Sequence, residues 1–354
     1  MATSILGLDI GGANLKAATP DKRAVSVPFP LWKQPDKLPA ALAALVAQFP
    51  DAEELAVTMT GELCDCFETK REGVHAIIKA VRFASAARPI HVWSTDGVFL
   101  NSEEAKANHM KVAAANWHAL ATFAGSYVPE GRAILVDVGS TTTDVIPILD
   151  GVPVPQGKTD YDRLTTRELI YTGVRRTPVC ALQGFDTAAE LFATTLDAYL
   201  VLGLVAENAE ERDTADGRPA TRKCAHARLA RMLGGDTDTV SEERVQQLAE
   251  DCHWRQRGQL SKSIDHIGDR LADMFTDEPW IPPDEETKRT IEFDPDLRRH
   301  FIKSGIKHVV SGSGEFLTRQ ECPDPISLND KLGPAVSACA PAYAVAVLAA
   351  ERRP

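Results

Sequence analysis

Two aspartates, Asp9 and Asp137, each end an apolar run and stand two residues before a glycine. The surrounding segments are Leu6-Gly-Leu-Asp-Ile-Gly-Gly-Ala-Asn-Leu-Lys16 and Val136-Asp-Val-Gly-Ser-Thr-Thr-Thr-Asp-Val145. An apolar run of this kind predicts a strand that carries its carboxylate into a tight turn. Glycine lets such a turn approach phosphate oxygens closely, because glycine has no Cβ and tolerates positive φ. The two segments therefore predict a duplicated phosphate-binding turn with one acid in each half of the chain.

The elements around the first turn alternate between strand and helix patterns. Strands are expected at residues 4–8, 15–18, 54–60 and 90–93, and apolar residues at helical spacing predict a helix over 38–49. A further helix is expected to begin at Ser102 and to run to about Phe123. This alternation of strands and helices predicts an α/β fold.

The pattern restarts after residue 131, where residues 133–138 are expected to form a new first strand. We therefore expect a first lobe over residues 1–129, a second lobe with a helical insertion over 130–332, and a C-terminal helix over 333–354 that packs back on the first lobe.

Within the second lobe, Thr187 and Glu190 predict a capping box whose helix reaches about residue 207. Two apolar stripes over residues 245–252 and 260–275 predict further helix, and surface loops are expected at 279–283 and 294–295. A late strand over 307–310 enters a third glycine turn at 311–314.

Composition limits the partners of the protein. The 354 residues carry a formal net charge of −11, with a pI near 5.4, which argues against general affinity for nucleic acid or an anionic membrane. Residues 333–350 are uncharged but rich in alanine, which favours a buried helix over a membrane span. No export signal is recognisable, and the seven cysteines are an odd number, so we expect reduced thiols and a cytoplasmic protein.

The order and spacing of the glycine segments resemble the actin, heat-shock chaperone and sugar-kinase superfamily. Residues 6–18 match its first phosphate motif, 136–148 its second, and 309–317 its adenosine motif. The resemblance implies a two-domain actin/sugar-kinase-like fold, with duplicated ribonuclease H-like lobes and an interdomain phosphate-binding cleft. It also implies that Asp9 and Asp137 orient a Mg²⁺ with its waters, or act as a base.

The same resemblance implies a set of phosphate- and nucleotide-binding residues, given by Gly11, Gly12, Asn14 and Lys16 in the first turn, Gly139, Ser140, Thr141, Thr142 and Thr143 in the second, and Gly312, Ser313, Gly314 and Glu315 in the third. Taken singly, each has a plainer interpretation. A Gly-Gly pair after a strand is often a simple turn, Lys16 is compatible with a solvated lysine, and residues 141–143 are compatible with an exposed strand.

Four segments carry a closer resemblance: Asp137-Val-Gly-Ser-Thr-Thr-Thr-Asp144, Thr60-Gly-Glu-Leu-Cys-Asp-Cys-Phe67, Ala114-Ala-Asn-Trp-His-Ala-Leu120 and Arg175-Arg-Thr-Pro-Val-Cys-Ala-Leu182. The first is similar to the second phosphate motif of the hydantoinase A/oxoprolinase group. The others resemble one branch of that group, the tetrahydromethanopterin-linked one-carbon pathway proteins and methanofuran-biosynthesis aryl-ether synthases. Members of that branch join an aminomethyl-furan-methyl diphosphate to the phenol oxygen of γ-glutamyltyramine and release diphosphate.

This branch implies a transferase with a small-molecule diphosphate and a phenolic substrate, of tyramine or tyrosine type. On this interpretation Asp9, Asp137 and Asp144 divide the metal and base roles, and the cofactor is Mg²⁺. ATP is compatible with the motifs but is not required. Arg175 and Arg176 are candidates to bind a phosphate or the glutamyl carboxylates, although two adjacent arginines also suit a solvated surface. A homo-oligomer is compatible with the sequence.

Two departures from the superfamily pattern bear on the reaction. Ala13 and Asn14 follow the first glycines, where kinases usually place a hydroxyl side chain, and this weakens the case for phosphoryl transfer. Glu315 replaces a small residue of the third turn and suits either a ribose or the aminomethyl group of the furan. The alternatives are an ATP-dependent small-molecule kinase, a hydantoinase/oxoprolinase-type amidohydrolase, and a nucleotide-gated binding protein. No helix-turn-helix precedes Leu6, which disfavours a DNA-binding regulator.

Overall fold

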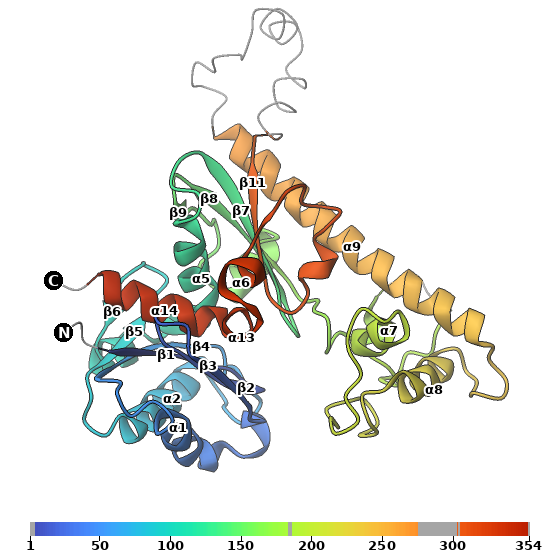
Figure 1. Cartoon of the computed structure of the whole chain (residues 1–354), viewed down its shortest axis with the longest axis horizontal. Helices are drawn as coiled ribbons and strands as arrows, with labels where there is room; N and C mark the ends of the chain where they lie inside the picture. The colour runs from blue at the N-terminus through green and yellow to red at the C-terminus, as the bar shows by residue number, and fades with distance from the viewer. Residues whose placement is uncertain (1–3, 183–185, 275–302, 304, 353–354) are drawn as a thin grey trace, which may run out of the picture. The chain divides into compact units, whose positions relative to one another are not determined.

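A computed structural model of the chain describes residues 4–182, 186–274, 303 and 305–352. Strands and helices alternate along the chain and build two separate sheets with helices packed against them (Figure 1). The chain divides into two compact units. The first comprises residues 1–135, 146–166 and 326–354, and the second comprises 136–145 and 167–325. The expected α/β fold is confirmed, whereas the predicted lobe boundaries and the cleft between lobes stay predictions.

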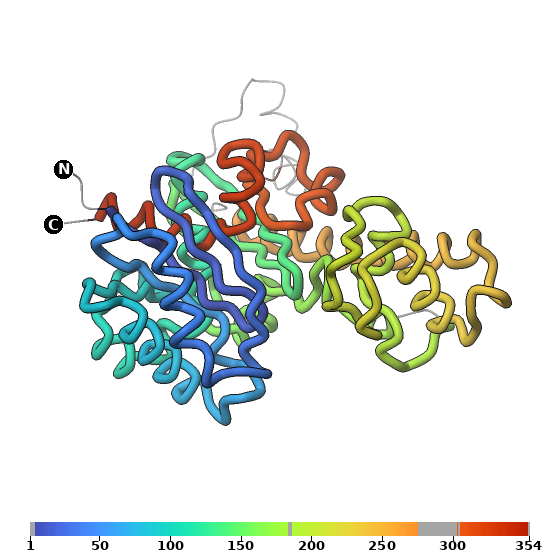
Figure 2. The backbone as a smooth tube through the Cα atoms, turned by 60° about the horizontal axis from the view of Figure 1, so that its bottom comes forward, coloured from blue at the N-terminus to red at the C-terminus, as the bar shows by residue number. Residues whose placement is uncertain are grey.

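The sheet of the first unit has the strand order β3-β2-β1-β4-β5-β6. Its first three strands form an antiparallel meander, which Figure 2 shows as adjacent blue segments. On the other side of β1, strands β4 and β5 run parallel to it. The strand bounds are β1 Ile5–Ile10, β2 Asn14–Ala18, β3 Ala24–Pro28, β4 Glu54–Met59, β5 Ile90–Trp93 and β6 Phe99–Leu100.

Helices cover both faces of this sheet, with α1 and α2 on one face and α14 on the other (Figure 1). All six residues of β1 are buried between these layers. A Cβ on Gly7 would lie 1.9 Å from the carbonyl oxygen of Ala342, so β1 and α14 touch through their backbones. The helices and short elements of this unit are α1 Leu38–Val46, α2 Lys70–Ala84, α3 Ser102–Ala107, α4 His109–Val112, α5 Asn116–Gly125, α6 Asp160–Thr165, α12 Leu328–Leu332, α13 Pro334–Ser337, α14 Ala340–Glu351, η1 Leu31–Lys33 and η2 Pro35–Lys37.

The second sheet has the order β10-β8-β7-β11-β12, and β9 pairs with β8. Its centre repeats the plan of the first sheet, because β8, β7 and β11 stand in the same order as β2, β1 and β4. In both sheets a first strand carries the Asp and has its hairpin partner on one side and a later strand on the other. This repetition confirms the duplicated fold. The bounds are β7 Arg132–Val138, β8 Thr143–Leu149, β9 Val152–Pro153, β10 Leu169–Ile170, β11 Lys307–Ser311 and β12 Ile326–Ser327.

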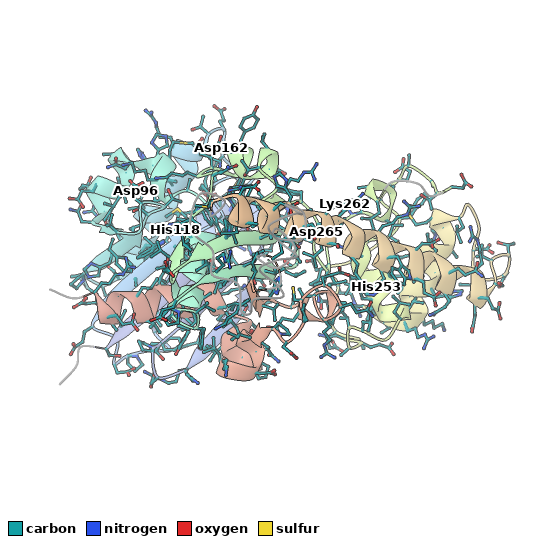
Figure 3. The ribbon with its side chains drawn as sticks, turned by 90° about the horizontal axis from the view of Figure 1, so that it is seen from above. Asp96, His118, Asp162, His253, Lys262 and Asp265 are labelled. Atoms are coloured by element: carbon teal, nitrogen blue, oxygen red, sulfur yellow. The ribbon has the colours of Figure 1, made fainter. Side chains whose placement is uncertain are left out.

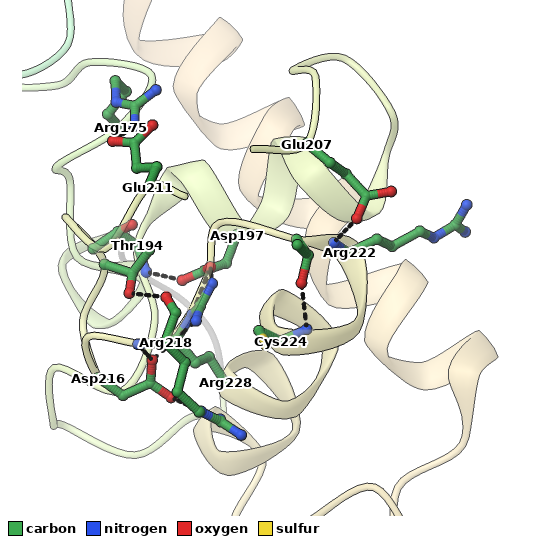
Figure 4. Close-up of polar contacts among 12 residues, drawn as sticks. Arg175, Thr194, Asp197, Glu207, Glu211, Asp216, Arg218, Arg222, Cys224 and Arg228 are labelled. Atoms are coloured by element: carbon green, nitrogen blue, oxygen red, sulfur yellow. Dashed lines mark hydrogen bonds and ion pairs between the residues drawn. The ribbon is translucent and has the colours of Figure 1, made fainter. Parts of the chain in front are cut away.

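The helical part of the second unit is built from α7 Thr195–Val201, α8 Arg222–Met232 and α9 Glu242–Asp273, with the short elements η3 Val179–Ala181 and η4 Glu315–Leu317. Apolar side chains of the three α-helices share one core. The fully buried Arg228 lies within it, 2.6 Å from Asp197 and 2.9 Å from Asp216 (Figure 4). Helix α9 carries His253, Lys262 and Asp265 along its length (Figure 3).

Two helix predictions are wrong. No helix begins at Thr187. A capping box instead forms at Thr194 and Asp197, and α7 follows it with every residue buried. Residues 186–192 are exposed or half-buried, so this segment buries no apolar face in the core. The helix expected from Ser102 is three helices. Asn108, with φ −107° and ψ +38°, separates α3 from α4. Ala114, whose φ of +47° no α-helix accommodates, separates α4 from α5. Its cap is Asn101 rather than Ser102.

The two apolar stripes of the second lobe lie on one helix, α9, as far as residue 273. Residue 275 and the loops expected at 279–283 and 294–295 lie outside the described residues. The uncharged stretch near the C-terminus forms α13 and the buried α14. Across the described part of the chain, no helix is both long and apolar enough to cross a membrane.

Candidate phosphate-binding turns

The first two glycine turns are closed by the same hydrogen bond. Gly11 N–H donates to the carbonyl of Asn14 at 3.0 Å, and Gly139 N–H donates to that of Thr142 at 2.9 Å. Each glycine therefore bonds to the residue three positions on, and an aspartate precedes each glycine by two positions. Among the described residues, no acceptor pairs with the N–H groups of the two middle residues of either turn. Successive N–H groups in such a turn form a concave anion site.

Asp9 lies in β1 and is 5% exposed. Its Oδ1 has no hydrogen-bond partner within the described residues. Burial raises the pKa of Asp9 above its ordinary value, and the charge of Lys16 lowers it less. Lys16 faces Asp9 across the β1–β2 register. The first turn thus holds a desolvated carboxylate whose one nearby counter-charge is the lysine of the same motif.

Asp137 is the second-last residue of β7 and lies beside the third glycine turn. A Cβ on Gly312 would lie 2.8 Å from Asp137 Oδ1 and 2.3 Å from the carbonyl oxygen of Val138. Gly312 has a φ of +89°, and Gly314 N–H donates to Val138 at 2.9 Å. Only glycine fits at residue 312, because both the contact and the backbone angle exclude a side chain. The second and third motifs therefore lie together in one unit.

The remaining residues of these motifs differ in exposure. Ser313 is exposed at the tip of the third turn, and Glu315 begins η4. Asp144 is buried in β8. The hydroxyl of Thr143 is also buried and donates to the carbonyl of Thr172 at 2.8 Å, so it serves the fold, whereas Ser140 and Thr141 are half-buried in the turn.

A segment over residues 172–177 supports the second turn from one side. The N–H groups of Arg175 and Arg176 both donate to the carbonyl of Ser140 at 3.0 Å. Both side chains pair with acids. Arg175 bonds to Glu211 (Figure 4), and Arg176 lies 3.2 Å from Asp213. The arginines predicted as substrate residues therefore stand beside the phosphate turn and pair with carboxylates of the 208–222 loop.

Helix α9 fixes this supporting segment. The side-chain amide of Gln256 donates to Thr172 Oγ1 at 2.7 Å and to the carbonyl of Gly173 at 2.8 Å. Tyr199 donates its hydroxyl to the amide oxygen of Gln256. A Cβ on Gly173 would lie 2.5 Å from backbone atoms of Ser140 and Thr141, so the segment touches the turn directly.

The predicted site residues thus form two groups. The first turn, with Asp9 and Lys16, belongs to the first unit, and the second and third turns, with Asp137, belong to the second unit. The sharing of one ion by Asp9 and Asp137 stays a prediction. Within the described residues, no three His, Cys, Asp or Glu side chains gather as a metal-binding cluster. Mg²⁺ does not require one, since it is usually bound by one or two carboxylates and substrate phosphates.

Comparison with known proteins identifies the family. A profile of the hydantoinase/oxoprolinase family matches residues 53–352. The chain belongs to the hydantoinase/oxoprolinase family. A curated relative from Methanocaldococcus jannaschii is 36% identical over 282 residues, which cover 76% of this chain and 83% of the relative. One from Methanococcus vannielii is 30% identical over 234 residues, covering 61% of this chain and 90% of the relative.

Both relatives carry the name (4-{4-[2-(gamma-L-glutamylamino)ethyl]phenoxymethyl}furan-2-yl)methanamine synthase. The resemblance to the aryl-ether synthase branch of the family is thereby confirmed. Among solved structures, nucleotide-free acetone carboxylase matches with a TM-score of 0.49 at 10% identity, covering 98% of this chain and 70% of that one.

One histidine of this family member is packed rather than solvated. His118 is 8% exposed, and its Nδ1 accepts a hydrogen bond from Trp93 at 3.3 Å. Burial, together with the charges of Lys158 and Arg352, lowers its pKa to about 4. His118 and Asp96, both labelled in Figure 3, line a pocket of about 680 Å³ in the first unit. His118 is therefore neutral at pH 7 and fills space beside Trp93.

Sequence reasoning gave no role to Glu62, although it lies within one of the family segments. It is 1% exposed, and burial raises its pKa to about 7. Neither of its carboxylate oxygens has a hydrogen-bond partner among the described residues. The available signal was its position, because a charged residue between Gly61 and Leu63 stands just after a buried strand.

Proposed function

We propose that this protein is a transferase that joins an aminomethyl-furan-methyl diphosphate to the phenol oxygen of a γ-glutamyltyramine-type or tyrosine-type substrate and releases diphosphate. The observation that carries the proposal is the pair of Asp-x-Gly turns with matching geometry, in a chain whose curated relatives are named as synthases of a phenoxymethyl-furan amine. The name of both relatives describes a phenoxymethyl-furan, which is an aryl ether. Because both relatives are named as synthases, they support the interpretation of this protein as an enzyme.

The reaction needs little covalent chemistry from the protein. The bond between the furan methyl carbon and the diphosphate oxygen breaks, and its electron pair leaves with diphosphate. The phenol oxygen forms the new bond to that carbon, and its proton passes to a base. A furfuryl carbon tolerates positive charge, so the main task of the protein is to bind the leaving group and to aim the phenol.

The turns suit this task because each has two successive backbone N–H groups with no acceptor among the described residues. Ser140 and Thr141 offer two such groups in the second turn, and Gly12 and Ala13 offer two in the first. Donors that are fixed before the reaction stabilise charge as it develops on the leaving oxygens. Arg175 and Arg176 are further candidates to bind a phosphate or a glutamyl carboxylate.

Mg²⁺ fits the acids of these motifs. Asp9 presents a buried oxygen with no partner among the described residues, and carboxylate oxygens are the ligands that Mg²⁺ prefers. We propose that Asp9 and Asp137 hold the ion and that Asp144 is a candidate base. When bound, the ion neutralises charge on the diphosphate. ATP is not required by this reaction.

The decisive experiment is an incubation of the purified full-length protein with Mg²⁺, the furan diphosphate and either γ-glutamyltyramine or tyrosine, without ATP. We expect stoichiometric release of diphosphate and an ether product that mass spectrometry detects. Release that depends on ATP would reject this function. It would instead favour the amidohydrolase or kinase alternative, of which the match to the hydantoinase/oxoprolinase profile favours the amidohydrolase.

A further inference from the structure

Glu62 lies against the first phosphate turn. The N–H groups of Thr60 and Gly61 both donate to the carbonyl of Ile10 at 3.0 Å. A Cβ on Gly12 would lie 2.7 Å from Cys64 Sγ. Residues 60–64, which we call the acidic turn, are therefore in backbone and side-chain contact with the turn proposed to bind diphosphate.

The backbone of the acidic turn packs on α2, and the residues beside Glu62 differ in exposure. A Cβ on Gly73 would lie 2.1 Å from the carbonyl oxygen of Glu62, so the backbone of the turn rests on α2. The next side chain, that of Leu63, is 55% exposed, and Asp65 is exposed too. The buried Glu62 side chain is thus followed directly by exposed residues of the chain.

Two backbone N–H groups, a lysine and an aspartate act on the charge of the carboxylate. Burial raises its pKa, while its own N–H, Lys70 and the N–H of Ala114 lower it and Asp160 raises it. Asp160 is itself paired with Arg163 at 2.8 Å. In the described part of the chain, neither Glu62 oxygen has a hydrogen-bonding partner. An unpaired buried carboxylate is costly and rare, and it points to a ligand.

A neighbouring aromatic ring has an unpaired donor as well. The guanidinium of Arg163 lies 4.3 Å from the ring centroid of Trp117. Among the described residues, the indole Nε1 of the buried Trp117 has no hydrogen-bond acceptor. Trp117 follows Ala114 by three residues. Two unpaired polar groups therefore lie in the same part of the first unit, where α5, α6 and the acidic turn contribute residues.

The chemistry of the missing partner follows from the free atoms of Glu62. Two free acceptor oxygens call for several donors and a positive charge. A phenol offers one donor and no charge, whereas a primary ammonium offers three donors and one charge. We infer that Glu62 binds a primary ammonium group of the substrate, an inference that rests on the proposed function.

Both proposed substrates carry such a group: the aminomethyl of the furan and the α-amino group of the γ-glutamyl moiety. The furan is favoured, because its diphosphate end is proposed to bind at the turn that contacts residues 60–64. Glu62 then selects for the aminomethyl end of a molecule that is held at its other end by the phosphate turn. When the ammonium binds, Glu62 releases its proton to solvent and becomes the anion of the pair.

The test compares substrates with and without each ammonium, using the full chain with Mg²⁺. The furan diphosphate is compared with an analogue lacking the aminomethyl group, and γ-glutamyltyramine with glutaryltyramine, which lacks the α-amino group. We expect the wild type to prefer the aminomethyl substrate in kcat/KM by roughly ten- to hundredfold, as for a charge-assisted hydrogen bond. In Glu62→Gln the preference falls to near one, and Glu62→Asp recovers part of it.

The exposed Glu53→Gln is the matched control and should keep the wild-type preference. If Glu62→Gln instead abolishes the preference for γ-glutamyltyramine over glutaryltyramine, the inference stands, and the ammonium that Glu62 binds is the α-amino group. If Glu62→Gln keeps both preferences, the inference is wrong.

A second measurement separates this inference from the proposed function. Furfurylamine is titrated calorimetrically into the full-length protein with Mg²⁺ and inorganic diphosphate at pH 7, in two buffers of different ionisation enthalpy. We expect binding with proton release in the wild type and in Glu53→Gln, and neither in Glu62→Gln. Glu62-dependent binding without any ether formation would reject the proposed function and keep the amine site. Equal heats for wild type and Glu62→Gln would reject the amine site.

Discussion

Asp9 combines a functional position with a cost in stability. Its carboxylate is almost fully buried, and burial raises its pKa above the ordinary 3.8. A folded-state pKa above the unfolded one means that ionisation opposes folding, so this acid destabilises the protein increasingly as pH rises above about 4. Groups of this kind persist where function needs them.

We therefore predict that Asp9→Asn lowers kcat/KM by at least ~100-fold, as expected for loss of a group that orients a metal or donors in the transition state. The same change should raise the free energy of unfolding at pH 8 and have little effect at pH 4, because the neutral amide avoids the cost of a buried charge. Urea denaturation at both pH values, beside diphosphate-release kinetics, checks this. A variant less stable than wild type at pH 8 would contradict it.

Glu62 should give the stability curve a distinct pH dependence. Its pKa is about 7 in the folded protein and 4.5 ordinarily, so the folded state holds the proton more tightly. Stability is then greatest below pH 4.5 as far as this group is concerned, and about 3 kcal/mol is lost as pH rises through 7. Glu62→Gln should remove that fall, and denaturation of both proteins between pH 4.5 and 8 measures it. Parallel curves for the two proteins would refute the shift.

At the scale of elements, the support of the second phosphate turn depends on Gln256 of α9. Replacing it with leucine removes its hydrogen bonds to Thr172, Gly173 and Tyr199. Thr172 and Gly173 keep bonds to the hydroxyls of Thr177 and Thr195, whereas the buried Tyr199 hydroxyl loses its bond to Gln256. We predict a loss of about 2 kcal/mol in the free energy of unfolding and a raised KM for the furan diphosphate. Gln247→Leu, exposed on the same helix, is the control. A KM change of equal size in both variants would rule out a specific role for Gln256.

Substitution by alanine at two glycines should change the stability of the protein in opposite directions. A Cβ on Gly173 would meet backbone atoms of the second turn at 2.5 Å, whereas one on Gly258, in the interior of α9, would meet nothing within 4 Å. Gly173→Ala should lower both stability and diphosphate affinity. Gly258→Ala should raise stability by about 0.5–1 kcal/mol, since alanine favours a helix. Melting temperatures measure the stability of both variants, and titration with diphosphate measures their affinity. A Gly173→Ala variant with unchanged stability and affinity would show that the supporting segment and the second turn are not tightly packed.

Elements that are determined by neighbouring residues in the chain could be predicted from the sequence. The strands on either side of each glycine turn were expected because an apolar run, an Asp and a glycine stand together. The helix expected at Thr187 failed because the same capping pattern recurs at Thr194, and only packing in the core selects between them. The break at Ala114 carries no glycine or proline to announce it. Local sequence patterns therefore predict the positions of the glycine turns, but they do not predict helix boundaries that depend on tertiary contacts.

The candidate site was predictable to a similar extent. The acids and glycines of the turns follow from the motifs, and Gly312 shows why one of them must be glycine. The support from Gln256 and the burial of Glu62 depend on residues far apart in sequence, with Gln256 separated from Thr172 by 84 positions. No spacing rule connects such residues, so these parts of the site emerge only from the fold.

At the scale of the whole molecule, the sequence predicts that Asp9 and Asp137, one from each unit, serve a single Mg²⁺ and a single diphosphate. A double-mutant cycle tests this. If the two acids act as one functional unit, Asp9→Asn, Asp137→Asn and the double variant should lower kcat/KM by similar factors, because either change already disables the shared ion. Independent sites would instead give a double variant whose loss is the product of the single losses. Addition of EDTA should abolish wild-type turnover and leave the residual rate of the double variant unchanged. Wild-type turnover that resists EDTA, or losses of kcat/KM that multiply in the double variant, would show that the two acids do not share an ion.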